Sequence, residues 1–164
     1  MEKDRHCSYC GVAFAAGLAF PRTCAGCGSI TYRNPTPVAV LLVPVDDGLL
    51  GIRRGIEPRK GELALPGGFV DAADESWQAA AARELFEETG ITIDAALVRD
   101  FGVRSTGKGG PVLLFGVGPR LASRDLPVFT ATNETAERVV LAASDRLAFP
   151  LHEWAMKEYF TRIR

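Results

Sequence analysis

The sequence has no long apolar run, no apolar signal-peptide core and no excess of charge of either sign. Each absence argues against one class of location or binding partner. The apolar stretch 12–20 is far shorter than the roughly 20 residues that a membrane-spanning helix needs. The charged start, Met-Glu-Lys-Asp-Arg-His, is unlike a signal peptide. A net charge of -1 gives no general attraction to nucleic acid or to an anionic membrane. We therefore expect a cytoplasmic protein that has neither a membrane nor a nucleic acid as its partner.

The most informative segment is residues 83–91, Arg-Glu-Leu-Phe-Glu-Glu-Thr-Gly-Ile. With Ser76 as N-cap and Gly90 as the stop, it predicts a helix over 77–89. The carboxylates at 84, 87 and 88 have the i, i+3, i+4 spacing that places side chains on one helical face. Mg²⁺ takes oxygen ligands of this kind and shares them with substrate phosphates. For the spacing alone, a solvated acidic helix face is an equally good interpretation.

A Pro-Gly-Gly turn at 66–68 precedes this helix, and its backbone can approach a ligand closely. Turn and helix together resemble the Nudix box, in which a glycine is followed by a spaced Glu and then by Arg-Glu-hydrophobic-x-Glu-Glu-x-Gly-hydrophobic. Residues 83–91 match throughout, and Glu75 lies eight positions before Arg83, as that pattern requires. Six residues separate Gly68 from Glu75 where the family has five, which we interpret as a one-residue insertion in the loop.

The resemblance implies an α/β fold, a Nudix α/β/α sandwich around a mixed sheet, and a hydrolase of nucleoside diphosphate derivatives. It implies an ion pair between Glu75 and Arg83 that fixes the helix to the loop. Backbone contacts near the metal would come from Gly67 and Gly68. The implied ligands of catalytic Mg²⁺ or Mn²⁺ are Glu84, Glu87 and Glu88.

Hydrolysis of a phosphoric anhydride also needs a carboxylate that accepts the proton of the attacking water. Within the helix, Glu88 or Glu87 is a candidate for this base. In many relatives the base or a further metal ligand comes from a later loop, and the acidic candidates there are Glu134 and Glu137. A solvent-exposed loop is an equally good interpretation of these two residues.

All four cysteines form two pairs, Cys7-x-x-Cys10 and Cys24-x-x-Cys27, with thirteen residues between the pairs. Two such knuckles match a tetrahedral Cys₄ zinc site, and nearby glycines allow the tight knuckle turns. Disulfides or a redox dithiol are the alternatives, and the former need an oxidising compartment. A Cys₄ site has no open coordination position, so its Zn²⁺ is expected to be structural. His6, which adjoins the first pair, and His152 are not expected to be catalytic.

The chain therefore divides into a predicted zinc ribbon at 1–33 and a Nudix domain at 34–164. The apolar run 38–45 predicts a buried strand, and Asp46-Asp47-Gly48 predicts a hairpin turn. Further expected elements are strands at 49–53, 91–103, 112–117 and 138–141, a strand and loop at 62–70, and a final helix at 151–163.

The ribbon, the Tyr-Arg-Asn-Pro linker at 32–35 and Arg-Arg-Gly-Ile-Glu-Pro at 53–58 resemble a Nudix subgroup that cleaves ADP-ribose or FAD and releases AMP. This subgroup implies phosphate contacts from Arg53 and Arg54. The subgroup often has a Trp near position 63, where this chain has Leu63, so the candidates for stacking on an adenine are instead Tyr32, Phe69 and Phe101. A place in the core is the commoner role of such an aromatic residue. The alternatives are an NADH pyrophosphatase, a hydrolase of a specialised nucleotide-linked intermediate, and a sensor that binds ADP-ribose without cleaving it. Family relatives are often dimers, so a homodimer is compatible with the resemblance.

Overall fold

A computed structural model describes residues 4–107 and 109–162, and the chain divides between Pro35 and Thr36 into two units. The predicted boundary lies two residues before this division. In the first unit, β1 and β2 form a short antiparallel hairpin that pairs Arg22 with Thr31. The elements in chain order are β1 (Arg22–Thr23), β2 (Ile30–Thr31), β3 (Pro37–Leu42), β4 (Pro44–Val45), β5 (Gly48–Arg54), β6 (Leu63–Ala64), β7 (Gly67–Phe69), α1 (Trp77–Thr89), η1 (Ala95–Leu97), β8 (Arg99–Ser105), β9 (Val112–Val117), η2 (Ser123–Asp125), β10 (Thr135–Leu141) and α2 (Pro150–Arg162).

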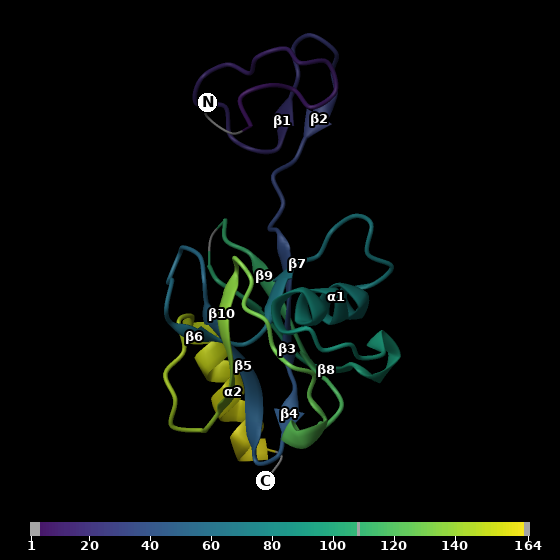
Figure 1. Ribbon diagram of the computed structural model, residues 1–164. Helices are drawn as coiled ribbons and strands as arrows, with labels where there is room; N and C mark the ends of the chain where they lie inside the picture. Colours follow the sequence, from purple (N-terminus) through teal and green to yellow (C-terminus); the bar gives the residue numbers. More distant parts are fainter. Residues whose placement is uncertain (1–3, 108, 163–164) are drawn as a thin grey trace. The chain divides into compact units, whose positions relative to one another are not determined.

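Two sheets form the second unit (Figure 1). The first has the strand order β7-β3-β9-β8, and its β3 and β9 run parallel while the other neighbours are antiparallel. The second has the order β10-β5-β4, with β6 also paired to β5. The mixed sheet predicted from the sequence is thereby confirmed.

The alternating side chains of β3 place this sheet between the two long helices. Val40 and Leu42 belong to one buried cluster, which includes Met156 of α2. Ala39 and Leu41 belong to a second cluster, on the α1 side of the sheet. Because successive strand residues point to opposite faces, one strand serves both cores. The predicted α/β/α layering is confirmed.

The helix predicted over 77–89 is confirmed at both ends. Ser76 Oγ accepts the Ala79 N–H at 3.1 Å, and Gly90 ends the helix in the left-handed conformation with φ 73°. The strand predicted at 112–117 matches β9, and the final helix is α2. In the part of the chain that the structure describes, no helix is long and apolar enough to cross a membrane.

The strand predicted over 91–103 is wrong in its first half. The strand begins only at residue 99 and ends at 105, and a 3₁₀ turn occupies 95–97. The Asp94 carboxylate accepts the Ala96 N–H at 2.9 Å, so a side chain offers the backbone an alternative to a strand ladder. The apolar run 38–45 is also split, between β3 and β4, and the chain passes from one sheet to the other near Val43.

Candidate active site and metal centre

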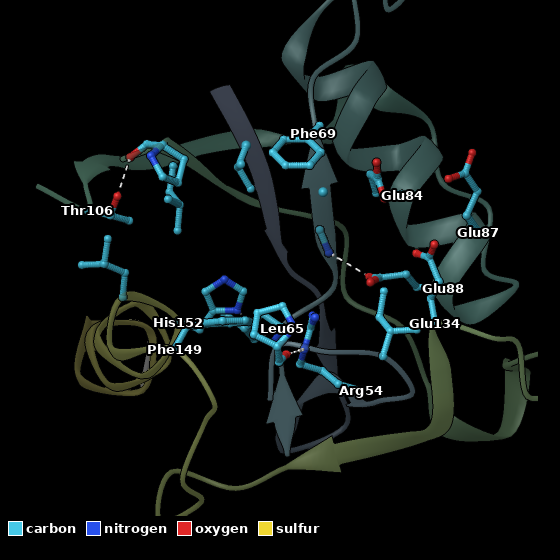
Figure 2. Close-up of a pocket in the computed structure, with 18 of the residues that line it drawn as sticks. Arg54, Leu65, Phe69, Glu84, Glu87, Glu88, Thr106, Glu134, Phe149 and His152 are labelled. Carbon is cyan, nitrogen blue, oxygen red and sulfur yellow. Dashed lines mark hydrogen bonds between the residues drawn. The ribbon is translucent and has the colours of Figure 1, made fainter. Parts of the chain in front are cut away.

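A cavity of about 700 Å³ lies beside α1 in the second unit (Figure 2). Segments far apart in the sequence line it: β7, α1, the end of β5, the turn before β10, the β8–β9 hairpin and the start of α2. The predicted site residues on its wall are Arg54, Gly67, Gly68, Glu84, Glu87, Glu88 and Glu134.

The three α1 carboxylates share this cavity but differ in burial. Glu88 is 6% exposed, and its Oε2 accepts the Gly67 N–H at 2.9 Å. Burial, reinforced by the negative charge of Glu84, raises the pKa of Glu88 to about 8. Burial also raises the pKa of Glu84, although Arg83 opposes this shift. The Glu87 side chain is 54% exposed. The inner part of the site therefore holds two carboxylates whose negative charge is destabilised in the metal-free protein.

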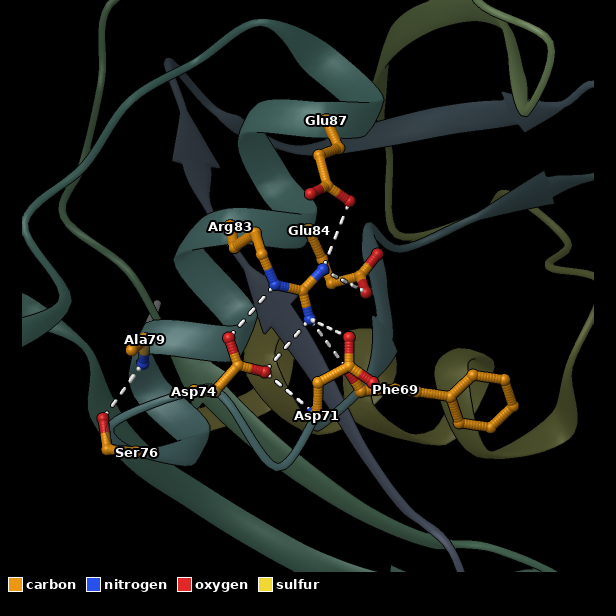
Figure 3. Close-up of polar contacts among 8 residues, drawn as sticks. All are labelled: Phe69, Asp71, Asp74, Ser76, Ala79, Arg83, Glu84 and Glu87. Atoms are coloured by element: carbon orange, nitrogen blue, oxygen red, sulfur yellow. Dashed lines mark hydrogen bonds and ion pairs between the residues drawn. The ribbon is translucent and has the colours of Figure 1, made fainter.

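Arg83 ties α1 to the preceding loop (Figure 3). Its Nε lies 3.1 Å from Asp74 Oδ1 and its Nη2 lies 3.1 Å from Asp74 Oδ2. The same guanidinium donates to Glu84 at 2.8 Å, to Glu87 at 3.2 Å and to the Phe69 carbonyl at 2.9 Å. Its hydrogen bonds hold the pKa of Asp74 below the ordinary value. The Arg83 guanidinium thus orients Glu84 and Glu87, two of the carboxylates that face the cavity.

The predicted partner of Arg83 was Glu75, and this prediction is wrong. Glu75 is exposed and is not among the ion-pair partners of Arg83 in the described residues. Five residues separate Gly68 from Asp74, so counting forward from the glycine leads to Asp74, whereas counting back from the helix leads to Glu75. A turn in which Asp71 N–H donates to Asp74 Oδ2 at 2.8 Å aims the shorter carboxylate at Arg83.

The two glycines of β7 permit close approach for different reasons. A Cβ on Gly68 would lie 2.3 Å from Glu84 Cδ, so the bare backbone leaves room for this carboxylate. A Cβ on Gly67 would lie 2.3 Å from the Ala39 carbonyl oxygen, in the neighbouring strand β3. The missing side chain of Gly68 therefore leaves space for Glu84 on the acidic wall of the cavity. The missing side chain of Gly67 lets β7 pack closely against β3 in the sheet.

Arg54 and Glu134 face the α1 carboxylates from the second sheet (Figure 2). The charge of Arg54 acts on both Glu88 and His152, favouring the ionised acid and the neutral imidazole. Arg54 Nε donates to the Pro58 carbonyl at 2.8 Å. The Glu134 carboxylate has no hydrogen-bond or ion-pair partner within the described ranges. Both side chains are positioned to contact a ligand.

Other predicted residues lie elsewhere. Glu137 and Arg53 pair with each other at 2.8 Å on the exposed surface of β10 and β5, and neither lines the cavity. Tyr32 belongs to the first unit and is not a lining residue. Of the candidate stacking residues in the second unit, Phe69 lines the cavity and is 60% exposed, whereas Phe101 contacts Trp154.

Sequence reasoning missed the opposite wall, which includes Thr106, Phe149 and His152. These residues come from the β8–β9 hairpin and the start of α2. No motif marks them, because only the folded sheet order brings them next to α1. His152 was not expected to be catalytic, and it is one of the residues that line the cavity.

In the first unit the four cysteines converge. In the described part of the chain they are the one group of three or more Cys, His, Asp or Glu ligands whose atoms lie within 4.8 Å of one another. Cys7 Sγ and Cys27 Sγ are 3.8 Å apart, and Cys10 Sγ and Cys24 Sγ are 3.5 Å apart. Thiolates about 2.3 Å from a tetrahedral Zn²⁺ are about 3.8 Å from each other. The thiol spacing therefore fits zinc, and no cysteine is in a disulfide.

The two knuckles share one geometry. Tyr9 N–H donates to Cys7 Sγ and Gly26 N–H donates to Cys24 Sγ, each at 3.4 Å. Gly11 and Gly28 each follow the second cysteine of a pair, with φ 76° and 74°. Hydrogen bonds from Ser29 lower the pKa of the Cys27 thiol to about 6, which favours the thiolate that binds a metal.

A family model described as the NUDIX domain matches residues 35–155. The chain belongs to the NUDIX family. The matched region contains the whole of the cavity described above, whereas the four cysteines lie before it.

Relatives of this NUDIX chain include two named enzymes. The NAD-capped RNA hydrolase NudC of Edwardsiella ictaluri is 33% identical over 93 residues, which are 56% of this chain. The ADP-ribose pyrophosphatase of Methanocaldococcus jannaschii is 40% identical over 60 residues, which are 37% of this chain. The matched region spans 35% of the length of each. A NUDIX hydrolase from Nitrosomonas europaea has a similar structure, with a TM-score of 0.78, 25% identity, and coverage of 96% of this chain and 90% of that one.

Proposed function

We propose that this NUDIX domain hydrolyses the pyrophosphate bond of a nucleoside diphosphate derivative, with ADP-ribose as the first candidate and AMP as one product. The observation that carries the proposal is the convergence of Glu84, Glu88, Glu134 and Arg54 on one cavity. Carboxylates and a guanidinium facing one another suit a ligand that brings phosphates together with divalent cations.

The acidic wall fits Mg²⁺ or Mn²⁺ by its chemistry. Glu84 and Glu88 offer hard oxygen ligands, and burial disfavours their negative charge unless a cation is present. Arg83 donates hydrogen bonds to both Glu84 and Glu87, at 2.8 Å and 3.2 Å, and so orients them beside the cavity. When bound, the divalent cation supplies Lewis-acid stabilisation of the phosphate oxygens.

The remaining steps belong to residues of this chain. Arg54 binds a phosphate of the substrate through its guanidinium. Glu134 accepts the proton of the attacking water, because its carboxylate faces the cavity and has no partner among the described side chains. In the first unit, the four cysteines hold a structural Zn²⁺.

The experiment compares Glu134→Gln and Glu84→Gln with Glu137→Gln. Wild-type protein is incubated with ADP-ribose and Mg²⁺ or Mn²⁺, and AMP release is followed by chromatography. We expect both cavity variants to lose at least about a hundredfold in kcat. Glu137 is close to Glu134 in the sequence but pairs with Arg53 outside the cavity, so Glu137→Gln should retain wild-type activity. Equal losses in all three variants would contradict the assignment.

A second candidate follows from the similarity to NudC, whose name specifies NAD-capped RNA. NADH, NAD-capped RNA and FAD therefore belong in the same assay. A kcat/KM for NAD-capped RNA at least tenfold above that for ADP-ribose would favour this second function. AMP binding without hydrolysis of any compound would favour a sensor.

A further inference from the structure

The His152 side chain is fixed at the start of α2, on the cavity wall that the acidic residues do not occupy. It is 7% exposed, and its ring contacts Phe149 with centroids 5.1 Å apart and Phe115 with centroids 6.2 Å apart. The Leu65 N–H donates to its Nδ1 at 3.3 Å. Two aromatic contacts and one hydrogen bond therefore hold the imidazole in one orientation.

The bond from Leu65 determines which ring nitrogen carries the proton. Because Nδ1 accepts a hydrogen bond, a neutral imidazole must have its proton on Nε2. The imidazole is neutral, since burial and then the positive charge of Arg54 lower the pKa of His152 to about 3. His152 therefore presents an N–H donor at Nε2.

This donor is open to the cavity. Nε2 has no hydrogen-bond partner within residues 4–107 and 109–162, and it is not among the buried unpaired atoms, where Thr135 Oγ1 stands alone. His152 is a lining residue, and Figure 2 shows one ring nitrogen directed into the cavity. The His152 ring is almost buried, and its Nε2–H is thus available to a ligand in the cavity.

The surroundings of this donor are apolar. Phe149 lies beside His152, while the carboxylates lie across the cavity (Figure 2). Val38, Leu113 and Leu151 are further apolar lining residues of the cavity. Arg54 also lines the cavity and acts electrostatically on both Glu88 and His152, so its charge is close to the acidic wall and to the imidazole. A ligand whose phosphates bind at the acids and Arg54 would extend a neutral, flat portion toward His152.

We propose that His152 Nε2–H is a specificity-determining donor, which binds an acceptor atom of the substrate's heteroaromatic base. This inference rests on the proposed function, because that function places the phosphates at the acidic wall. With the adenine of the proposed substrate the acceptor is a ring nitrogen, an uncharged group that suits the apolar residues around the donor.

Two substitutions separate this role from a purely structural one. A Gln side chain places its amide near the position of Nε2, and an Asn side chain places its amide near Nδ1. His152→Gln therefore keeps a donor in the cavity, and His152→Asn keeps an acceptor for Leu65. If His152 acted only through Leu65, Asn would be the better replacement.

The test measures binding of AMP by titration calorimetry with Mg²⁺ present, using 1-deaza-, 3-deaza- and 7-deaza-AMP as probes of the ring nitrogens. For wild type we expect one analogue to bind about tenfold more weakly than AMP. His152→Gln should bind AMP within about threefold of wild type. His152→Asn should bind about tenfold more weakly and no longer distinguish the analogues.

Several results would overturn the inference: no AMP binding, equal binding of all three analogues by wild type, or Asn matching wild type while Gln is weakened. A spectroscopic readout is independent of affinity. The chain has only His6 and His152, so side-chain ¹⁵N spectra with His6→Gln assign both imidazoles, and AMP should shift the His152 Nε2 resonance. Hydrolysis is measured separately, so binding with this pattern but without AMP release from ADP-ribose refutes only the proposed function.

Discussion

Arg83 and Asp74 form the ion pair that joins α1 to the loop before it, through two N–O contacts of 3.1 Å each. Arg83 also holds Glu84 and Glu87, so the pair orders two residues of the cavity at once. The extra loop residue has moved this role from Glu75 to its neighbour without loosening the attachment of the helix.

Replacing Asp74 is expected to destabilise the protein. In Asp74→Asn the partly buried guanidinium loses its bidentate carboxylate, and we expect the free energy of unfolding to fall by about 1–3 kcal/mol. Chemical denaturation measures this change. The control is Glu75→Gln, where an exposed carboxylate is removed and the change should stay within about 0.5 kcal/mol. Equal destabilisation by both variants would contradict the assignment of the pair.

Glu88 is expected to make the metal-free protein less stable as pH rises. Its pKa is about 8 in the folded protein and near 4.5 in the unfolded chain, so folding favours the protonated acid. This contribution is fully present below about pH 4.5 and is lost as pH rises through about 8.

Thermal unfolding without added divalent cation tests the effect of Glu88. Glu88→Gln should match wild type at pH 5 and exceed it in Tm at pH 8. Added Mg²⁺ should raise the Tm of wild type more than that of the variant, since it neutralises the carboxylate. A constant Tm difference between pH 5 and pH 8 would contradict the raised pKa.

Alanine at the two β7 glycines is expected to act in different ways. In Gly68→Ala the atoms nearest to the new methyl belong to the carboxylate end of Glu84, which can rotate away, so the protein should fold with a loss below about 1 kcal/mol. Displacement of Glu84 should weaken Mg²⁺-dependent activity by at least about tenfold.

Gly67→Ala is the matched comparison for this variant. Its methyl would meet the main chain of β3, which cannot move without breaking the sheet, so a loss of about 3 kcal/mol or more is expected. Denaturation curves and steady-state kinetics of the two variants measure both effects. If Gly67→Ala were inactive but as stable as wild type, Gly67 would be needed for the active site and not for packing against β3, which would contradict this prediction.

Neighbouring arginines offer a test of phosphate binding. Arg54 lines the cavity, while Arg53 pairs with Glu137 outside it. Arg54→Met is expected to raise KM for ADP-ribose by at least about tenfold, because a charge-assisted hydrogen bond contributes about 1.5–3 kcal/mol. Arg53→Met should change KM by less than about twofold. Similar KM values for both variants would exclude Arg54 from the phosphate site.

The cysteine cluster predicts one equivalent of zinc per chain. Cys24→Ser removes a buried ligand, and metal analysis should show loss of the zinc together with loss of amide-exchange protection around β1 and β2. His6→Gln is the control and should retain the metal. Zinc bound by Cys24→Ser at wild-type stoichiometry would contradict a four-thiolate site.

The residues that the sequence predicted well share local patterns. The helix 77–89 has a cap, a stop and a periodic acidic face, and the cysteine pairs have a fixed spacing, so neighbours along the chain carry the information. The prediction of a strand over 91–103 was wrong in its first half, because the hydrogen bond from Ala96 N–H to the Asp94 carboxylate competes with strand pairing there.

The wall that includes His152 could not be predicted from local patterns, because it depends on distant pairing. Leu65 and His152 meet only after β6, β7 and α2 assemble around the sheet. The choice between Asp74 and Glu75 was also open in the sequence, because counts from Gly68 and from Arg83 lead to different residues. The turn between Asp71 and Asp74 decides which carboxylate reaches Arg83.

The hydrogen bond from Gly67 N–H to Glu88 Oε2 joins the helix to the strand that pairs with β3. An ionised carboxylate accepts such a bond more strongly than a protonated one. A bound cation favours the ionised form of Glu88 and should therefore strengthen this hydrogen bond, so the Gly67 amide proton would report whether the cation is bound.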